Sequence, residues 1–462
     1  MLLSQAAQVL GGKLIGPDVR FNAVSSDSRA IAPGDLFVAL QGERFDGSTF
    51  VAAALQDGAA AAMVNADKLE KRVPDLDPET SILAVEDTRL ALGRLAAHWR
   101  AQFAIPLVAV TGSNGKTTVK EMLASVLRTA TGDTDAVLAT QGNLNNDIGM
   151  PHTLLKLRAT HRYAVIEMGM NHPGEIDYLT RIAQPDVAII NNASGAHLAG
   201  LGSVEAVARA KGEIFSGLPA NGIAVINADD DYAPLWRELA GDRQTIQFGL
   251  ECYVAIHAQW EMRGYGARIE VDTPQGSFNA NLQVPGAHNV RNALAATAAA
   301  VALHIPLSDI ATGLENFSGV AGRLQRKPAL HGAMLIDDTY NANPASLRSA
   351  IRVLLQAEGK KILVLGDMGE LGGDAAHLHS EIGAEARDMG VDELLALGEL
   401  SSHAVSEFGA GARHFDDVES LCAALDSEMS AGVTVLVKGS RFMKMERVVQ
   451  HCTQGEETCC SH

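Results

Sequence analysis

The stretch AVTGSNGKTT at 109–118 constrains the fold more than any other part of the chain. It follows the apolar run IPLVAV and opens KTTVKEMLASVL, whose apolar residues recur at helical spacing. A glycine-containing turn between a strand and a helix is typical of a phosphate site, because backbone N–H groups and the positive end of the helix dipole face the ligand. The common pattern G-x-x-x-x-G-K-[ST] would need a glycine at Val110, so the alternatives are a different nucleotide loop or a turn with a chance GKT. We predict a nucleotide-phosphate site in which Lys116 reaches the phosphates and Thr117 offers its hydroxyl to Mg²⁺.

Strand and helix patterns alternate through most of the 462 residues, which predicts an α/β protein with parallel sheets. This length suggests about three domains, at roughly 100–200 residues each. A helical pattern at 88–103 leads into the strand before the loop, and a new strand–helix series begins near Gly322. Between 245 and 285 the pattern changes to antiparallel strands with Gly-rich turns. The predicted units are a small α/β domain at 1–103, a central parallel-sheet domain of the phosphate-loop ATPase kind at 104–320, and a Rossmann-like α/β domain at 321–462.

The charge and cysteine content exclude several classes of function. The chain has 37 Lys and Arg against 55 Asp and Glu, a formal charge of −18, which argues against nucleic acid or an anionic membrane as partner. A bound phosphate must therefore be met by local groups, and a metal ion would supply positive charge there. The five cysteines have no paired C-x-x-C spacing, so neither a disulfide framework nor a zinc site is indicated. With no signal-peptide pattern and no membrane-length apolar run, we expect a soluble cytoplasmic protein.

Polar residues that follow predicted strands are candidates for the rest of the site. Glu167 ends the strand in YAVIEMG, at the sheet edge where ligands bind, and could hold Mg²⁺, although such a glutamate is commonly only a solvated charge. His197 follows the next strand and is either a second metal ligand or structural. The asparagines of GNLNNDIGMP at 142–151 suit either a turn or a polar substrate. No chemical feature separates Lys211, on the helical stretch ARAKGEIF, from an ordinary solvated lysine.

Two segments near the start of the third predicted domain add an arginine, carboxylates and amides. They are GRLQR at 322–326 and LIDDTYNANP at 335–344. An arginine that reaches a nucleotide from another domain can neutralise phosphate charge with two parallel hydrogen bonds.

Together these motifs resemble the Mur ligase family, ATP-dependent enzymes that form amide bonds in peptidoglycan synthesis. The family's phosphate loop is the shorter T-G-[ST]-[NS]-G-K-[ST], which TGSNGKTT matches, so the missing glycine is the family's own form. The resemblance covers essentially the whole chain through QGNLNNDIG, VIEMG, AHLAGLGS, AKGEIF, GAHNVRNALAA, GRLQ, DDTYNANP and LVKGSR. One segment departs from the commoner AHLEGFGS pattern at Ala199 and Leu201 and keeps its histidine.

The resemblance implies roles for individual residues. The residues expected to bind ATP are Gly112, Ser113, Asn114, Gly115, Lys116, Thr117, Thr118, Asn289, Asn292, Arg323, Asp337 and Tyr340. The expected metal ligands are Thr117, Glu167, His197 and, if carbamylated, Lys211; the expected catalytic residues are Lys116, Lys211, Glu167 and His197. The expected substrate-binding residues are Ser26, Asp27, Ser28, Arg29, Asp46 and Gly47 for the uridine nucleotide, Asn143, Asn145 and Asn146 for the muramyl peptide, and Asn341 and Asn343, near Lys438–Arg441, for the incoming amine.

Within the family, KGEIF, DDTYNANP and LGDMGELG resemble the members that add D-alanyl-D-alanine to UDP-N-acetylmuramoyl-tripeptide. The resemblance implies an ATP- and Mg²⁺-dependent ligase that forms an acyl phosphate and acts as a cytoplasmic monomer on small molecules, without nucleic acid or membrane insertion. Closure of three domains over the nucleotide would give open and closed forms, and in an open form Arg323 and the DDTY segment would lie far from the phosphate loop.

Three alternatives remain. A ligase that adds the third residue would be expected to carry a DNPR motif in its last domain, and this chain has none. A folylpolyglutamate synthase would not be expected to carry the N-terminal segment SSDSRAIAPGDLFVALQGERFDG. A nucleotide-dependent switch belongs to a different class and leaves the N-terminal domain and the metal candidates without a role.

Overall fold

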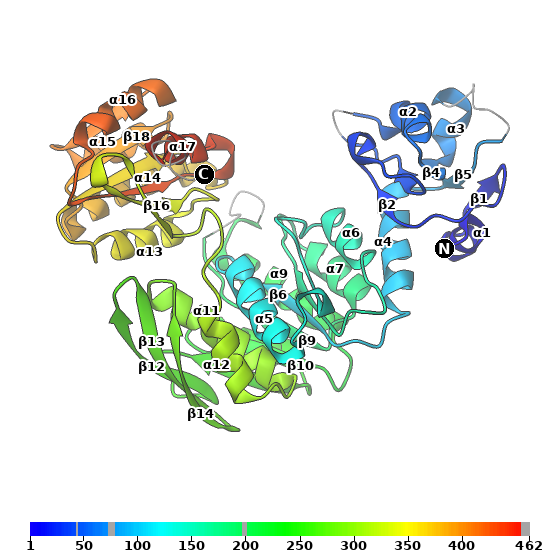
Figure 1. Cartoon of the computed structure of the whole chain (residues 1–462), viewed down its shortest axis with the longest axis horizontal. Coiled ribbons are helices and arrows are strands. Elements are labelled where there is room, and N and C mark those ends of the chain that lie inside the picture. Colours follow the sequence, from blue (N-terminus) through cyan, green and yellow to red (C-terminus); the bar gives the residue numbers. More distant parts are fainter. Residues whose placement is uncertain (43–44, 73–78, 196–200, 454–462) are drawn as a thin grey trace, which may run out of the picture.

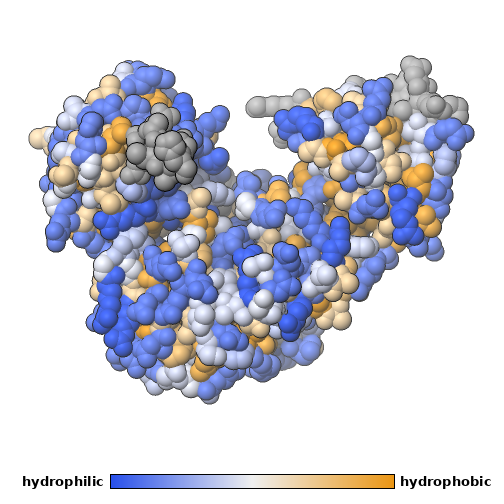
Figure 2. Space-filling view, in the orientation of Figure 1, coloured by the Kyte–Doolittle hydropathy of each residue, from blue (hydrophilic) through white to orange (hydrophobic). Residues whose placement is uncertain are grey.

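The computed structural model describes residues 1–42, 45–72, 79–195 and 201–453. The chain forms three α/β units, each around its own sheet, which confirms the predicted fold class. The first unit and the third stand apart, on either side of the central one (Figure 1). The space-filling view shows a wide opening between these two outer units (Figure 2). In the part of the chain that the structure describes, no helix has the length and apolar character needed to cross a membrane.

The N-terminal unit is a five-stranded sheet in the order β1-β5-β4-β3-β2, parallel except for β1 against β5. Its strands are β1 (Lys13–Ile15), β2 (Val24–Ser25), β3 (Leu36–Val38), β4 (Ala61–Asn65) and β5 (Ile82–Val85). Its helices are α1 (Leu3–Leu10), α2 (Val51–Gln56), α3 (Ala66–Arg72) and α4 (Thr88–Arg100), with 3₁₀ turns η1 (Ser28–Ala30) and η2 (Gly47–Phe50). Because β2 and β3 are parallel neighbours, η1 and η2, which follow them, lie at the same edge of the sheet.

The central unit has a nine-stranded sheet in the order β14-β13-β12-β11-β10-β9-β6-β8-β7. Its strands are β6 (Leu107–Thr111), β7 (Val137–Ala139), β8 (Tyr163–Glu167), β9 (Val187–Ile190), β10 (Ile223–Asn227), β11 (Gln244–Gly249), β12 (Ile256–Arg263), β13 (Gly266–Thr273) and β14 (Gly276–Leu282). Its helices are α5 (Lys116–Thr131), α6 (Gly149–Leu154), α7 (Glu175–Ala183), α9 (Val204–Gly212), α10 (Ala233–Ala240), α11 (Ala287–Ala302) and α12 (Leu307–Glu315), with 3₁₀ turns η3 (Thr134–Ala136) and η4 (Glu213–Gly217). The last three strands pair antiparallel, as predicted for 245–285, whereas β11, which begins this stretch, pairs parallel with β10 and β12.

The strand before the phosphate loop is buried on both faces. In β6, Val108 and Val110 pack into the core beneath α5 and α11, whereas Leu107 and Ala109 pack into the core on the other face. Successive side chains of a strand point to opposite faces, so a strand covered on both sides reads as one continuous apolar run. This burial holds the carboxyl end of β6, where the loop begins, in a rigid position.

The C-terminal unit has a six-stranded sheet in the order β15-β16-β20-β17-β18-β19, in which only β15 pairs antiparallel. Its strands are β15 (Gln325–Pro328), β16 (Met334–Asp338), β17 (Lys360–Gly366), β18 (Glu393–Leu397), β19 (Ala412–Phe415) and β20 (Val433–Lys438). Its helices are α13 (Pro344–Leu354), α14 (Ala375–Met389), α15 (Ser401–Phe408), α16 (Val418–Glu428) and α17 (Glu446–Thr453), with 3₁₀ turns η5 (Leu330–Gly332), η6 (Gly372–Asp374) and η7 (Arg441–Met443).

Helix α4 connects the N-terminal unit to the central one. Arg89 Nη2 donates to Asp147 Oδ1 at 2.8 Å, and Trp99 Nε1 donates to the carbonyl of Leu157 at 3.1 Å. At Gly93 an added Cβ would lie 2.1 Å from the hydroxyl of Tyr178, so glycine allows α4 to lie close to α7. These contacts run along α4 from Arg89 to Trp99 and fix the helix against the central unit.

Candidate nucleotide site

The phosphate loop depends on one glycine at the start of α5. Gly115 is the N-cap residue, with a φ of 79°, a conformation that side chains with a Cβ rarely adopt. A Cβ there would lie 2.4 Å from Asn292 Oδ1 and 2.5 Å from Asn191 Nδ2. Both the backbone conformation and the close approach therefore require glycine at this position, which is the second glycine of TGSNGKTT.

A network of amide side chains surrounds the loop. Asn192 Oδ1 accepts from the backbone N–H of Asn114 at 2.8 Å, and the Nδ2 atoms of Asn191 and Asn192 both donate to the Asn114 carbonyl at 3.0 Å. Asn191 Nδ2 also donates to Asn292 Oδ1 at 2.9 Å, and Asn292 Nδ2 donates to Asn289 Oδ1 at 3.1 Å. The loop is therefore held by the ends of β9 and α11 rather than by its own residues alone.

Behind the loop, Glu167 at the end of β8 is 2% exposed and fully hydrogen-bonded. Its Oε2 accepts from the hydroxyl of Thr117 at 2.8 Å, and its Oε1 accepts from Asn145 Nδ2 at 2.8 Å. Its backbone N–H donates to Thr140 Oγ1 at 2.9 Å. Two of the predicted metal ligands, one hydroxyl and one carboxylate, thus lie together, and Asn145 contacts the carboxylate directly.

Two lysines lie close to this site with lowered pKa values. Burial lowers the pKa of Lys116, while the negative charge of the nearby Glu167 acts in the opposite direction. The Nζ of Lys116 donates to the Gly112 carbonyl at 2.7 Å. Burial, reinforced by the positive charge of Lys116, holds the pKa of Lys211 well below its usual range. Lys211 is 2% exposed, and no residue in the described ranges is its hydrogen-bond or ion-pair partner. Its burial separates it from a solvated helical lysine.

His197, the fourth predicted metal ligand, lies outside the described residues, as does Ala199. In the ranges that the structure describes, no three His, Cys, Asp or Glu side chains form a cluster that could hold a metal ion. The oxygen pair of Thr117 and Glu167 is the part of the predicted metal site that the structure brings together.

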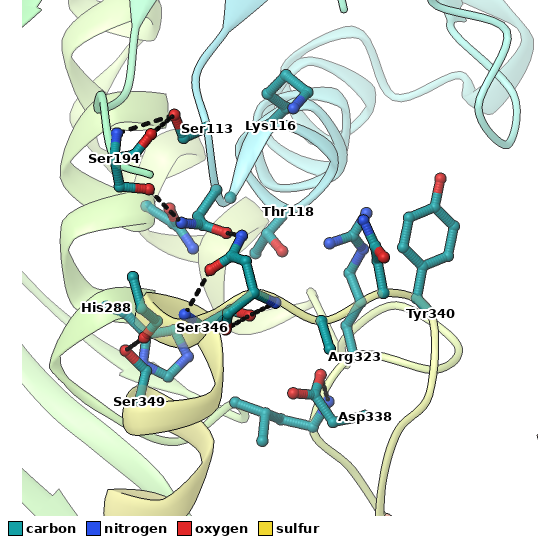
Figure 3. Close-up of a pocket in the computed structure, with 18 of the residues that line it drawn as sticks. Ser113, Lys116, Thr118, Ser194, His288, Arg323, Asp338, Tyr340, Ser346 and Ser349 are labelled. Carbon is teal, nitrogen blue, oxygen red and sulfur yellow. Dashed lines mark hydrogen bonds between the residues drawn. The ribbon is translucent and has the colours of Figure 1, made fainter. Parts of the chain in front are cut away.

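A cavity of about 830 Å³ opens in front of the loop, between the central and C-terminal units. This volume lies within the roughly 300–1,000 Å³ typical of small-molecule sites. Of the ATP candidates, Ser113, Asn114, Gly115, Lys116, Thr118, Asn289, Asn292, Arg323 and Tyr340 line it, as do Asn341, Asn343, Lys438, Ser440 and Arg441. Figure 3 shows Ser113 and Ser194, joined by hydrogen bonds, on one side of the cavity, and Arg323 beside Tyr340 on the other.

The C-terminal unit contacts the loop directly. Arg323 Nη2 donates to Thr117 Oγ1 at 3.0 Å, and its guanidinium lies over the ring of Tyr340, 4.1 Å from the ring centre. Asn343, the N-cap residue of α13, donates through Nδ2 to Asn114 Oδ1 at 2.9 Å. Of the open and closed forms that the sequence predicted, this arrangement corresponds to the closed one for the C-terminal unit. Arg323 Nε is buried without a partner among the described residues.

Of the two adjacent carboxylates in DDTY, Asp338 rather than Asp337 lines the cavity. Asp337 accepts from Lys327 Nζ at 2.7 Å and from the Thr339 hydroxyl at 2.7 Å. Asp338 forms a buried ion pair with Lys438, whose Nζ also donates to the Asn341 carbonyl at 2.9 Å. Neighbouring residues of a strand face opposite sides, and the motif alone does not show which of the two faces the nucleotide.

The uridine-nucleotide candidates lie in the N-terminal unit, apart from this cavity. Ser26 shares a 2.9 Å hydrogen bond with His152 Nε2 of the central unit. Asp27 and Arg29 pair with each other at 2.8 Å beside Ser28, at the start of η1. Asp46 caps η2 through the Ser48 N–H, and a Cβ on the buried Gly47 would lie 2.6 Å from the Leu40 carbonyl.

The remaining asparagine candidates differ in their surroundings. Asn143 and Asn146 are exposed, and Asn146 Oδ1 accepts from the Gly149 N–H at 2.8 Å, so it stabilises the turn before α6. The cavity also contains side chains that sequence reasoning missed: Asn191, Asn192, His288, Phe317, Ser346 and Ser349. Asn191 and Asn192 directly follow the apolar strand DVAII, a signal that could have identified them, whereas Phe317, Ser346 and Ser349 had no such signal.

Three family models match the chain. They are the Mur ligase family catalytic domain at residues 20–100, the Mur ligase middle domain at 110–300 and the Mur ligase glutamate ligase domain at 322–441. A UDP-N-acetylmuramoyl-tripeptide--D-alanyl-D-alanine ligase of Escherichia coli (strain K12) is 42% identical over 463 residues, 99% of each chain. The chain belongs to the Mur ligase family.

Solved structures agree with this assignment. A crystal structure of MurF from Acinetobacter baumannii is 40% identical, covers 97% of each chain and has a TM-score of 0.88. A MurF ligase from Thermotoga maritima in complex with ADP is 29% identical over 93% of this chain and 96% of that one, with a TM-score of 0.79. The predicted family, the three-unit fold and the prediction of an ATP-dependent ligase are confirmed.

Proposed function

We propose that this Mur ligase joins D-alanyl-D-alanine to the terminal carboxylate of UDP-N-acetylmuramoyl-tripeptide, with ATP converted to ADP and phosphate. The proposal depends above all on the similarity to an enzyme named for this reaction, 42% identical over 99% of both chains. It is supported by a cavity of about 830 Å³ bounded by a phosphate loop, in which a nucleotide would lie next to residues of the C-terminal unit.

The fit for Mg²⁺ rests on the donor atoms. Mg²⁺ prefers oxygen ligands, keeps several waters and usually takes one or two carboxylates together with substrate phosphates. The buried Thr117 hydroxyl and Glu167 carboxylate, 2.8 Å apart, match that preference without a larger acidic cluster. When bound, the ion would neutralise charge on the transferred phosphoryl group.

Lys211 is the proposed further ligand. Its lowered pKa favours the neutral amine, which can react with CO₂ to give a carbamate and release one proton. The carbamate would add a carboxylate-like oxygen donor at a place where the unmodified amine has no partner among the described residues. His197 remains a proposed ligand on the family resemblance.

The chain's own residues would act in two steps. The tripeptide carboxylate attacks the γ-phosphorus of ATP and the bond to ADP breaks, while Lys116 and the loop N–H groups stabilise the charge on the phosphate oxygens. The dipeptide amine then attacks the acyl carbon, the carbon–oxygen bond to phosphate breaks and the amine loses a proton. Arg323 would assist at the phosphoryl group, since it already contacts Thr117 at 3.0 Å. Closure of the C-terminal unit would exclude water from the acyl phosphate.

We also propose the division of labour among the units. Residues 1–103 would bind the uridine nucleotide at the sheet edge that carries η1 and η2, 104–320 would bind ATP, and 321–462 would bind the dipeptide and close over the nucleotide. Asn143, Asn145 and Asn146 would face the muramyl peptide, and Asn341 and Asn343 the dipeptide. The enzyme would act as a cytoplasmic monomer, which light scattering of the purified chain can test.

A phosphate-release assay tests the proposed reaction directly. Purified enzyme with ATP and Mg²⁺ is given UDP-N-acetylmuramoyl-tripeptide, with lysine or diaminopimelate as third residue, and D-alanyl-D-alanine. Phosphate release that requires both substrates supports the proposal. Release only with folate and glutamate, or only with a UDP-muramyl dipeptide and a single amino acid, contradicts it. Lys116→Ala, which removes the loop ammonium, should abolish release; a variant that retains full ligation would contradict the catalytic role of the loop.

A further inference from the structure

The antiparallel hairpin at the end of the central sheet reaches the C-terminal unit (Figure 1). Strands β12 and β13 pair up to Arg263 and Gly266, so the connection between them is the two residues Gly264 and Tyr265. Gly264 has a φ of 60°, which a tight two-residue turn requires. Tyr265 therefore stands at the tip of a fully paired hairpin, on a backbone whose position is fixed by the ladder behind it.

Tyr265 packs against the hydrophobic core of the C-terminal unit and makes two polar contacts with that unit. Its hydroxyl donates to the carbonyl of Leu324 at 2.8 Å, and the guanidinium of Arg326 lies 5.5 Å from the centre of its ring. Burial raises the pKa of Tyr265, so the phenol stays protonated and remains a donor. The phosphate loop is not involved in either contact.

Leu324 is held from both sides in an unusual conformation. Its φ is 49°, in the left-handed region that non-glycine residues rarely adopt. Its N–H donates to Asp338 Oδ1 of the C-terminal unit at 3.1 Å, while its carbonyl accepts from Tyr265 of the central unit. Such a conformation persists where the surrounding contacts determine it.

The residue before this restrained position is Arg323, the arginine that reaches the phosphate loop. Its Nη2 donates to Thr117 Oγ1 at 3.0 Å and its guanidinium lies over Tyr340. The direction of the Arg323 side chain depends on the backbone at 323–324. Besides the local turn bond from the Arg323 N–H to the Val320 carbonyl at 3.1 Å, the Tyr265 hydroxyl links the central sheet to that backbone. We infer that Tyr265 is a positioning residue, whose hydroxyl fixes Leu324 so that Arg323 is held at the phosphate loop.

The test is Tyr265→Phe in the full-length enzyme. Measurement of kcat/KM rests on the proposed function. This change removes one hydroxyl and keeps the ring and its packing. Loss of a single neutral hydrogen bond predicts a roughly threefold to tenfold fall in kcat/KM for ATP. The KM values for the tripeptide and the dipeptide should stay within twofold, and amide hydrogen exchange at 323–328 should become faster. A variant whose kcat/KM for ATP and exchange at 323–328 both match the wild type overturns the inference.

Two further variants separate positioning from a general loss of structure. In an Arg323→Gln background, Tyr265→Phe should cause no additional loss, because the two residues act in sequence; an equal loss in both backgrounds overturns the inference. Tyr253→Phe removes the hydroxyl of a tyrosine that is 89% exposed and serves as the matched control, with no change expected. Binding of a fluorescent ATP analogue to Tyr265→Phe, which needs no peptide substrate, keeps the test valid if the proposed substrates are wrong.

Discussion

Replacing Gly115 by alanine tests the description of the phosphate loop most sharply. The left-handed conformation at this residue costs roughly 1–2 kcal/mol for a side chain with a Cβ. The added Cβ would also lie 2.4 Å from Asn292 Oδ1, so the loop or the asparagine must move. Displacement of Asn292 would lose its hydrogen bond with Asn191, a further cost of about 0.5–1.5 kcal/mol. The sum is about 1.5–3.5 kcal/mol, and if the loop moves rather than unfolds, ATP affinity falls about 10-fold or more, since about 1.4 kcal/mol is tenfold.

Gly132→Ala is the matched control, because it lies at the other end of the same helix. Gly132 also has a positive φ, 67°, but a Cβ there meets nothing within 4 Å. It should therefore cost about 1–2 kcal/mol in urea unfolding and leave the affinity for an ATP analogue unchanged. Titration of both variants with the analogue separates the cost of the left-handed conformation, which both variants share, from the cost of the close approach to Asn292, which only Gly115→Ala has. Equal stability losses together with unchanged affinity in Gly115→Ala would refute the proposed collision.

Three more changes give separate expectations. Glu167→Gln keeps the shape of the side chain and removes its charge, so it should lower phosphate release roughly 10- to 100-fold, with partial recovery at high Mg²⁺. The control Glu175→Gln, on α7, should leave phosphate release unchanged. Thr140→Val leaves the buried N–H of Glu167 without its acceptor and should cost about 1–3 kcal/mol in chemical unfolding; Thr297→Val, whose hydroxyl bonds only within its own helix, should cost less. Burial, together with the charges of Lys438 and Arg291, lowers the pKa of His288 to about 4, so below pH 6.5 the unfolded chain binds more protons than the folded one. The free energy of unfolding should therefore fall as the pH is lowered from about 6.5 towards 4, and His288→Asn should flatten this decline.

The phosphate loop and the metal pair could be predicted because they depend on position along strands. An apolar run followed by a glycine turn and a helix has few alternative interpretations, and the carboxyl ends of β6 and β8 are adjacent because those strands pair. Thr117 and Glu167 were both expected near Mg²⁺, and they lie 2.8 Å apart. Their proposed role as metal ligands remains a prediction.

Other features depended on tertiary packing that no local pattern encodes. The burial of Lys211 follows from the packing of α9 into the core on one face of the central sheet, to which Val207, Ala208 and Ala210 belong. The sequence did not show which of Asp337 and Asp338 faces the cavity, because that depends on which residues of β16 point to each face of the sheet. The contact between Arg323 and Thr117 joins residues 206 positions apart, and it required the relative placement of two units.

The amide network around the phosphate loop has a consequence for how the enzyme responds to its surroundings. Asn114, Asn191, Asn192, Asn289 and Asn292 carry no titratable group, and their mutual hydrogen bonds involve no net charge. Added salt screens interactions between charges and leaves neutral hydrogen bonds largely unaffected. The amide contacts that hold the loop should therefore be insensitive to ionic strength and to pH. Any acid or salt dependence of nucleotide binding should come from charged groups such as Lys116 and His288, and from the phosphates themselves.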